Sequence, residues 1–155
     1  MITKLDNAND FVAKQIYITL QRSYKIEAEL IGALNFPPLS RTVTDIQNSQ
    51  TLFYGFYNDT QLAGVIELAI GNEGLEINSL VVYPDHFRKG IVDKLIRYAL
   101  SECVICAAIT TAIVETAVVN EPAIKLYKKH GFVEFKRWTP EHGIEKLAMV
   151  KSCDV

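Results

Sequence analysis

The most informative stretch of this sequence is Glu76-Ile-Asn-Ser-Leu-Val-Val-Tyr-Pro-Asp-His-Phe-Arg-Lys-Gly-Ile-Val92. Residues 75–83 are rich in apolar and β-branched side chains, which predicts a strand near the middle of a sheet. Pro84 cannot donate a ladder hydrogen bond, so we expect the strand to stop before it. Apolar residues then recur at helical spacing, which predicts a helix over residues 88–102.

A basic turn, Arg88-Lys89-Gly90, joins the predicted strand to the predicted helix. The first N–H groups of a helix have no acceptor within the helix, and the helix dipole is positive at that end. A turn of this kind therefore suits an anion, most often a phosphate group. The same pattern also occurs at helix starts that are only solvated, and the turn by itself leaves both interpretations open.

The composition is that of an ordinary globular protein, with one domain over residues 1–155. The chain has 155 residues, of which 49% are hydrophobic and 22% charged, enough to bury one core. A net charge of −2 provides no general attraction for nucleic acid. No apolar run approaches the ~20 residues that cross a bilayer, and no signal peptide is visible. We therefore expect a cytoplasmic protein with no nucleic-acid or membrane partner, and a homodimer is compatible with the sequence.

The chain has three cysteines, Cys103, Cys106 and Cys153. Cys103 and Cys106 have the spacing of a redox or metal pair, but no second pair of ligands accompanies them. We expect two thiols packed at the end of a helix, and we predict no metal site.

The remaining pattern predicts a sheet of about seven strands flanked by about four helices. In chain order it predicts a strand over 2–5, helical structure up to Gly32 as one helix or as two joined near Ser23, a short helix over 42–48, strands over 51–57 and 62–70, a strand over 107–118, a helix over 120–130, and strands over 133–138 and 144–150. Short turns join the three strands between 51 and 83, so we expect an antiparallel meander. A helix separates strands 75–83 and 107–118, so these two should be parallel. The expected fold class is α/β, with a mixed central sheet.

Two motifs in this order resemble those of the GNAT superfamily of N-acyltransferases. The segment from Val82 to Val92 resembles the family's acetyl-coenzyme A motif, and Asn120-Glu-Pro-Ala-Ile-Lys-Leu-Tyr-Lys-Lys-His-Gly-Phe132 resembles its next motif. The predicted order of elements is also that of the family. The first motif departs from the family pattern at Phe87, where a polar residue is usual, and at Val92, where a small one is usual.

The resemblance implies a GNAT-like fold and an N-acetyltransferase activity. Acetyl-coenzyme A would be the co-substrate, and an acetyl or similarly small acyl group would pass to a primary amine of a small molecule or peptide. Direct attack in a ternary complex is favoured over a covalent enzyme intermediate, because neither motif contains a cysteine. The changes at Phe87 and Val92 keep an alternative open, in which the same fold is a catalytically weak coenzyme A sensor or an interaction module.

The resemblance also assigns residues to the coenzyme. The pyrophosphate would bind at Phe87, Arg88, Lys89, Gly90, Ile91 and Val92, chiefly through backbone N–H groups. The backbone of Leu80, Val81 and Val82 would pair with the pantetheine amides and supply an oxyanion donor. Asn120, Ala123 and Tyr127 lie at i, i+3 and i+7, so they share a helix face that would look at the pantetheine arm.

Tyr127 resembles the family's general acid. A tyrosine pKa near ~10 and a thiol pKa near ~8.5 make full proton transfer to sulfur uphill by roughly 2 kcal/mol in water. Tyr127 would therefore need a lowered pKa, or would act mainly by hydrogen-bonding the sulfur. Glu67, in an apolar strand, and Glu76, on the next strand, are the candidate bases, each through a water molecule, and a solvent-facing role is open for both.

The acceptor site should be formed by the least family-like part of the chain. That part comprises the first helix, the loop over 35–41 and the strand over 51–57. The aromatic residues that it offers for this site are Tyr17, Tyr24, Phe36, Phe53, Tyr54 and Tyr57. If some of these rings line a cleft, they would suit a small amine or one with an apolar body.

Overall fold

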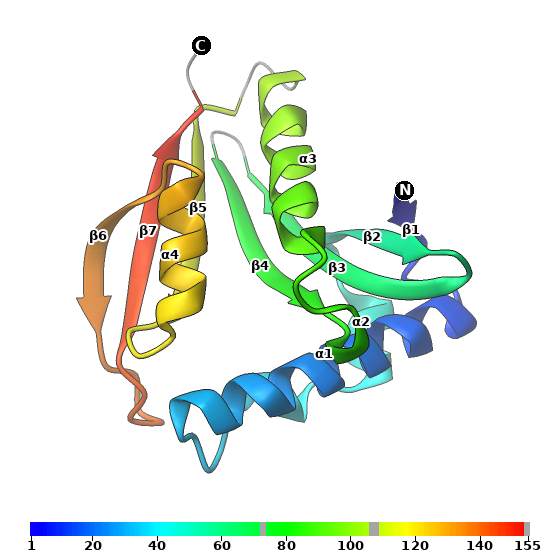
Figure 1. The fold of residues 1–155 in the computed structure, drawn as a ribbon, viewed down its shortest axis with the longest axis horizontal. Coiled ribbons are helices and arrows are strands. Elements are labelled where there is room, and N and C mark those ends of the chain that lie inside the picture. Colours follow the sequence, from blue (N-terminus) through cyan, green and yellow to red (C-terminus); the bar gives the residue numbers. More distant parts are fainter. Residues whose placement is uncertain (72–73, 106–108, 154–155) are drawn as a thin grey trace.

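The computed structural model describes residues 1–71, 74–105 and 109–153. A mixed seven-stranded sheet forms its centre (Figure 1). The strands are β1 (Ile2–Leu5), β2 (Leu52–Asn58), β3 (Gln61–Ile70), β4 (Gly74–Val82), β5 (Thr111–Ala117), β6 (Val133–Trp138) and β7 (Lys146–Ser152). Their spatial order is β1-β2-β3-β4-β5-β7-β6, and β4 and β5 are the parallel pair in an otherwise antiparallel sheet. The predicted α/β class, the antiparallel meander and the parallel pair are confirmed.

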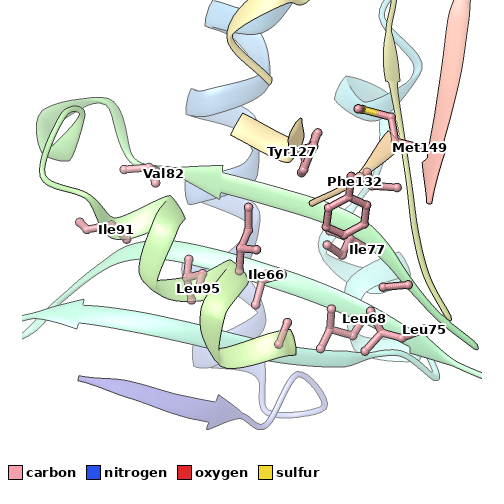
Figure 2. Close-up of a cluster of buried hydrophobic side chains, with 14 of the residues drawn as sticks. Ile66, Leu68, Leu75, Ile77, Val82, Ile91, Leu95, Tyr127, Phe132 and Met149 are labelled. Atoms are coloured by element: carbon pink, nitrogen blue, oxygen red, sulfur yellow. The ribbon is translucent and has the colours of Figure 1, made fainter. Parts of the chain in front are cut away.

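Helices cover both faces of the sheet. They are α1 (Asp10–Ile31), α2 (Val43–Asn48), α3 (Ile91–Ile105) and α4 (Glu121–Lys129), with short 3₁₀ turns η1 (Pro37–Ser40) and η2 (Pro84–His86). α1 and α2 bury Ile16 and Ile46 against one face of the sheet. α3 and α4 bury Leu95 and Tyr127 against the other face, in the cluster drawn in Figure 2. The Cys103 side chain and the whole of Cys106 are not described, so the predicted packing of these two thiols lies outside the described residues.

Local signals set the helix ends. The Asn9 side chain accepts a hydrogen bond from the N–H of Val12 and caps α1, which continues as one helix to Gly32 in the left-handed conformation. Thr42 and Asp45 form a reciprocal capping box at the start of α2. Of the two arrangements predicted for the first helical region, the single long helix is correct.

Some boundaries differ from the prediction. α3 begins at Ile91 and not at Arg88, because Arg88 and Gly90 have φ angles of 65° and 73°, which a right-handed helix cannot include. β7 begins at Lys146 and extends to Ser152, because its pairing with β5 continues to Thr111. The described part of β5 begins at Thr111, later than predicted.

A one-residue bulge in β4 changes which side chains face which helices. Glu67 of β3 pairs with Ser79, but the next residue of β3 pairs with Ile77, so Asn78 is the extra residue. Ile77, before the bulge, packs toward α3 and α4. Val81 has the same parity but packs toward α1 and α2, while Val82 packs toward α3 and α4. The bulge therefore inverts the alternation of side chains along β4.

Candidate active site at the opening between β4 and β5

The parallel pair β4 and β5 separates part-way along its length. The two strands are paired from Gly74 with Thr111 to Ile77 with Val114, and the described residues continue this pairing no further. On its other edge β4 stays paired with β3 as far as Val82. The backbone of β4 from Asn78 to Val82 is therefore left open on the side of β5, as at the edge of a sheet.

A cleft of about 870 Å³ occupies this opening. In Figure 1, α1 passes below the end of β4, and residues of α1 form part of the cleft wall. Most of the residues predicted to hold the coenzyme line it, namely Leu80, Val81, Val82, Phe87, Arg88, Gly90, Ile91, Val92, Asn120, Ala123 and Tyr127. The fold therefore brings the strand end, the basic turn and the face of α4 together around one space. This space, the open β4 backbone and the basic turn fit an extended thioester that carries phosphates.

The basic turn has the backbone of a compact anion-binding loop. Arg88 and Gly90 both have positive φ, and open space surrounds the position where a Cβ would stand on Gly90. The N–H of Lys94 makes a regular helical bond to the Gly90 carbonyl. The N–H groups before it, at the start of α3, have no acceptor within the helix and can face a ligand. Phe87 is exposed, and Val92 is half-buried and packs against the core below the cleft.

Lys89 is the one predicted coenzyme residue outside the described cleft wall. Its Nζ lies 3.1 Å from Nδ1 of His86, whose Nε2 lies 2.8 Å from Oε1 of Gln61. His86 is buried, so these contacts hold the basic turn against the β2–β3 hairpin. The Lys89 side chain thus positions the turn in this structure.

Tyr127 is buried in the cleft wall, with its ring edge-to-face against Phe132 at a centroid distance of 5.8 Å (Figure 2). Burial raises the pKa of Tyr127 well above its ordinary value, and the nearby Tyr24 and Glu27 raise this pKa further. The phenol is therefore a weak acid here. Of the two alternatives predicted for Tyr127, this environment favours hydrogen bonding to sulfur over a lowered pKa.

Glu67 lies under the bulge with every side-chain oxygen bonded. Arg41 donates to both carboxylate oxygens, at 2.6 and 2.9 Å. Thr51 donates at 2.6 Å and Ser79 at 2.9 Å. Burial acts to raise the pKa of Glu67, but the hydrogen bonds from Arg41, Thr51 and Ser79 outweigh it and hold the pKa below its usual value. Glu67 is therefore a stable carboxylate and a weak proton acceptor.

Glu76 is exposed on β4, at the closed end of the parallel pair. Partial burial raises the pKa of Glu76, the charge of Glu115 raises it further, and Lys146 opposes both effects. Glu76 is not part of the described cleft wall. A path from Glu76 to the reacting atoms would have to run through water.

A second, smaller pocket of about 330 Å³ adjoins the cleft at the bulge. Both spaces share Tyr24, Pro38, Asn78 and Ser79, and Arg41 and Glu67 line the smaller one. Among the six aromatic residues predicted for an acceptor site, Tyr24 and Phe36 line the cleft, and their ring centroids lie 5.8 Å apart in an edge-to-face contact. The other four pack with the two cores, namely Tyr17, Phe53, Tyr54 and Tyr57.

The sequence interpretation missed two charged residues of this site. Arg41, after η1, neutralises Glu67, and Glu27, on α1, accepts a hydrogen bond from Nδ2 of Asn120 at 3.2 Å. Glu27 follows Tyr24 by three positions on α1, which places it beside the apolar stripe of the helix. That spacing was the available signal for Glu27, whereas Arg41 had none.

No helix in the described part of the chain is long and apolar enough to cross a membrane. Among the described residues, no group of three or more His, Cys, Asp or Glu side chains could hold a metal ion.

Comparisons with known proteins place these observations in a family. Residues 16–132 match the model of the Acetyltransferase (GNAT) family. The UPF0157 protein YqkA of Bacillus subtilis (strain 168) is 36% identical over 132 residues, which are 85% of this chain. This chain spans 38% of the length of that relative.

Solved acetyltransferase structures have the same fold. The ribosomal-protein-S18-alanine N-acetyltransferase of Escherichia coli superimposes with a TM-score of 0.78 over 100% of this chain and 94% of that protein, at 18% identity. The PaiA N-acetyltransferase of Thermoplasma acidophilum, solved in complex with coenzyme A, gives a TM-score of 0.78 over 98% of each chain, at 19% identity.

Proposed function

Since the chain belongs to the GNAT family of acetyltransferases, we propose that it moves an acetyl or other small acyl group from acetyl-coenzyme A to a primary amine. The amine attacks directly in a ternary complex. The new C–N bond forms as the C–S bond breaks, and the net proton movement is from nitrogen to sulfur. A metal ion takes no part in this proposal.

The opening between β4 and β5 is the observation that carries the proposal. The described pairing of β4 with β5 stops at Ile77 and Val114, and a space of about 870 Å³ opens where the backbone of Asn78–Val82 has no strand on the side of β5. An extended molecule with amide groups can bond to this backbone as an added strand would. A thioester held in this way passes between the basic turn and Tyr127.

Each group around the cleft then has a task. The N–H groups near Gly90 and the cation of Arg88 hold the pyrophosphate. A backbone N–H within Leu80–Val82 stabilises the oxyanion that develops on the carbonyl. The Tyr127 hydroxyl hydrogen-bonds the departing sulfur, in keeping with its raised pKa.

The acceptor is a small primary amine or one with an apolar body. Tyr24 and Phe36 stand in the cleft wall and offer aromatic surface to such a body. Solved acetyltransferases of this fold include a protein-alanine acetyltransferase and an aminoglycoside 6'-N-acetyltransferase, so the fold alone does not choose the acceptor. A cytoplasmic location and a homodimer stay predictions.

The test is a screen of primary amines with acetyl-coenzyme A, read as release of free thiol. Alkyl and aralkyl amines, amino acids, aminoglycosides and peptide N-termini should be included, with binding of acetyl-coenzyme A measured separately by thermal shift. Turnover with one amine class supports the proposal. A ligand at 100 times its dissociation constant should add about 2.7 kcal/mol of stability.

The alternative is a coenzyme A sensor that does not turn over. The observation behind it is the departure at Phe87 and Val92, both of which line the cleft. Tight binding of acetyl-coenzyme A without acylation of any amine would favour this alternative. The absence of both binding and turnover would exclude the two functions together.

A further inference from the structure

Glu27 is a carboxylate in the cleft wall that has no role in the acyl transfer as proposed so far. It lies on the part of α1 that forms the cleft wall, and it is half-buried. Asn120, the N-cap of α4, donates a hydrogen bond from Nδ2 to Oε1 of Glu27 at 3.2 Å. Among the described residues this is the single hydrogen bond that the Glu27 carboxylate accepts, so Oε2 is available to a ligand.

The surroundings of Glu27 strengthen it as a proton acceptor. Burial raises the pKa of Glu27, while the bond from Asn120 and the charge of Lys146 act in the opposite direction. A carboxylate with a raised pKa binds a proton more readily at the pH of the cell, which is what general base catalysis requires. The other titratable and charged groups of the described cleft wall are Tyr24 on α1, His86 on η2, Arg88 in the basic turn, Asp93 on α3, Glu115 on β5, Tyr127 on α4, His142 before β7 and Lys146 on β7.

The other two candidate bases are less suitable. Arg41, Thr51 and Ser79 occupy the oxygens of Glu67 and hold its pKa low. Glu76 is exposed and stands outside the described cleft wall. Glu27 shares the cleft with Tyr127, and its charge contributes to the raised pKa of that tyrosine.

We propose that Glu27 is the catalytic residue that takes the proton from the acceptor's amine, on the premise that the proposed acyl transfer holds. The amine nitrogen bonds to the carbonyl carbon and gives one proton to Oε2 of Glu27. The C–S bond breaks, and the departing thiolate accepts a hydrogen bond from the Tyr127 hydroxyl and takes a proton from water. Glu27 returns its proton to water, so the net movement is one proton from nitrogen to sulfur.

The acceptor consequently binds beside α1, between Glu27 and the thioester. Its charged form, the ammonium, is attracted by the Glu27 carboxylate and loses one proton to water before the neutral amine attacks. Ile26 and Leu30, one residue before and three after Glu27, give this end of the cleft an apolar wall. A primary amine on an apolar body matches both features, whereas an amine with an adjacent carboxylate would be repelled by Glu27.

The deciding experiment uses Glu27→Gln with the amine that the screen finds to be turned over fastest. Glutamine keeps an oxygen that can accept the bond from Asn120, so α1 and α4 stay joined. We expect kcat to fall at least 100-fold, and the acidic limb of the kcat–pH profile to disappear, with the dissociation constant for acetyl-coenzyme A within twofold of wild type. Glu29→Gln, at an exposed position of the same helix, is the matched control and should behave as wild type.

The outcomes separate this inference from the proposed function. If wild type turns over an amine and Glu27→Gln keeps its kcat and its acidic limb, Glu27 is not the base while the acyl transfer stands. A slow variant that retains the acidic limb would also overturn the proposal, since Glu27 would then only position other groups. Restoration of Glu27→Ala by added formate would support it. If wild type acylates no amine, the proposed function itself fails.

Discussion

Arg41 and Glu67, 26 positions apart in the chain, form a two-point ion pair under the bulge of β4, with N–O distances of 2.6 and 2.9 Å. The Glu67 side chain is 2% exposed and that of Arg41 is 26% exposed. The pair fastens the segment between η1 and α2 to the centre of the sheet. It also forms one wall of the smaller pocket beside the cleft.

Removal of Arg41 should therefore be costly. Arg41→Ala leaves a buried carboxylate without its cation, and we expect a loss of about 3–5 kcal/mol in the free energy of unfolding, measured by urea denaturation. Lys14→Ala breaks the exposed Lys14–Asp10 pair and should cost less than about 1 kcal/mol. Equal losses in the free energy of unfolding would show that the buried pair stabilises the fold no more than the exposed pair does.

The same pair should make stability depend on pH. The pKa of Glu67 is lower in the folded protein than the ~4.3 of a free glutamate, so its contribution is complete above that value and is lost as the pH falls through the folded pKa. We expect the stability difference between wild type and Glu67→Gln to shrink as the pH is lowered from 7 to 3. A difference that stays constant over this range would contradict the assignment.

The capping box of α2 offers a local test. Thr42→Ala removes the hydroxyl that accepts from the N–H of Asp45, and should cost about 1 kcal/mol of stability. Thr44→Ala, at an exposed position inside the same helix, should leave stability unchanged or raise it slightly. Thermal unfolding of the two variants beside wild type measures both effects. An equal loss from both would mean that the cap is unimportant.

Gly90→Ala should weaken binding of the coenzyme. The new Cβ would stand in the open space where we place the pyrophosphate, and alanine is strained at a φ of 73°. We expect at least a tenfold rise in the dissociation constant for acetyl-coenzyme A, by calorimetry. Gly32→Ala has a matching φ of 70° and open surroundings at the end of α1, so it carries the strain without the block. If Gly32→Ala weakens binding equally, the effect of Gly90→Ala does not come from obstruction of the pyrophosphate.

Tyr127→Phe should lower kcat while it leaves the KM for acetyl-coenzyme A within about threefold. The ring and its contact with Phe132 remain, and the hydroxyl that bonds sulfur is removed. A fall of about 100-fold is expected for a group that assists the leaving thiolate. Tyr98→Phe, whose ring packs on Tyr54, is the control. Because burial raises the pKa of Tyr127, the wild-type kcat should show no basic limb from this residue below pH 10. A variant with unchanged kcat would remove Tyr127 from the mechanism.

Local signals made most of the fold predictable. The cap at Asn120, the capping box at Thr42 and the strand end before Pro84 each depend on neighbours within a few residues. The cleft residues were predictable for the same reason, since the turn around Gly90 and the face of Asn120 and Tyr127 are short motifs. The predicted roles of Glu67, Glu76 and Tyr127 stay predictions, because roles depend on a bound substrate.

Long-range pairings were not predictable. Nothing near Arg41 in the sequence marks Glu67 as its partner, and the bond between Glu27 and Asn120 joins positions 93 residues apart. The bulge at Asn78 was not predicted, although the sequence carries a signal for it: Leu75 and Ile77 alternate with Glu76 and Asn78, and the alternation breaks where Ser79 follows. The two pairings, in contrast, depend on how whole elements meet in three dimensions.

The extra residue at Asn78 determines how residue number relates to the face of the sheet for each later side chain of β4. Beyond it, Ser79 meets Glu67 and Val82 meets α3. Loss of Asn78 alone would leave a regular ladder in which Ser79 still lies opposite Glu67 and Val82 still faces α3. Loss of one residue beyond the bulge would instead exchange the two faces of the rest of the strand, because side chains alternate along it. The tolerance of this strand to a one-residue deletion should therefore depend on whether the bulge residue is the one removed.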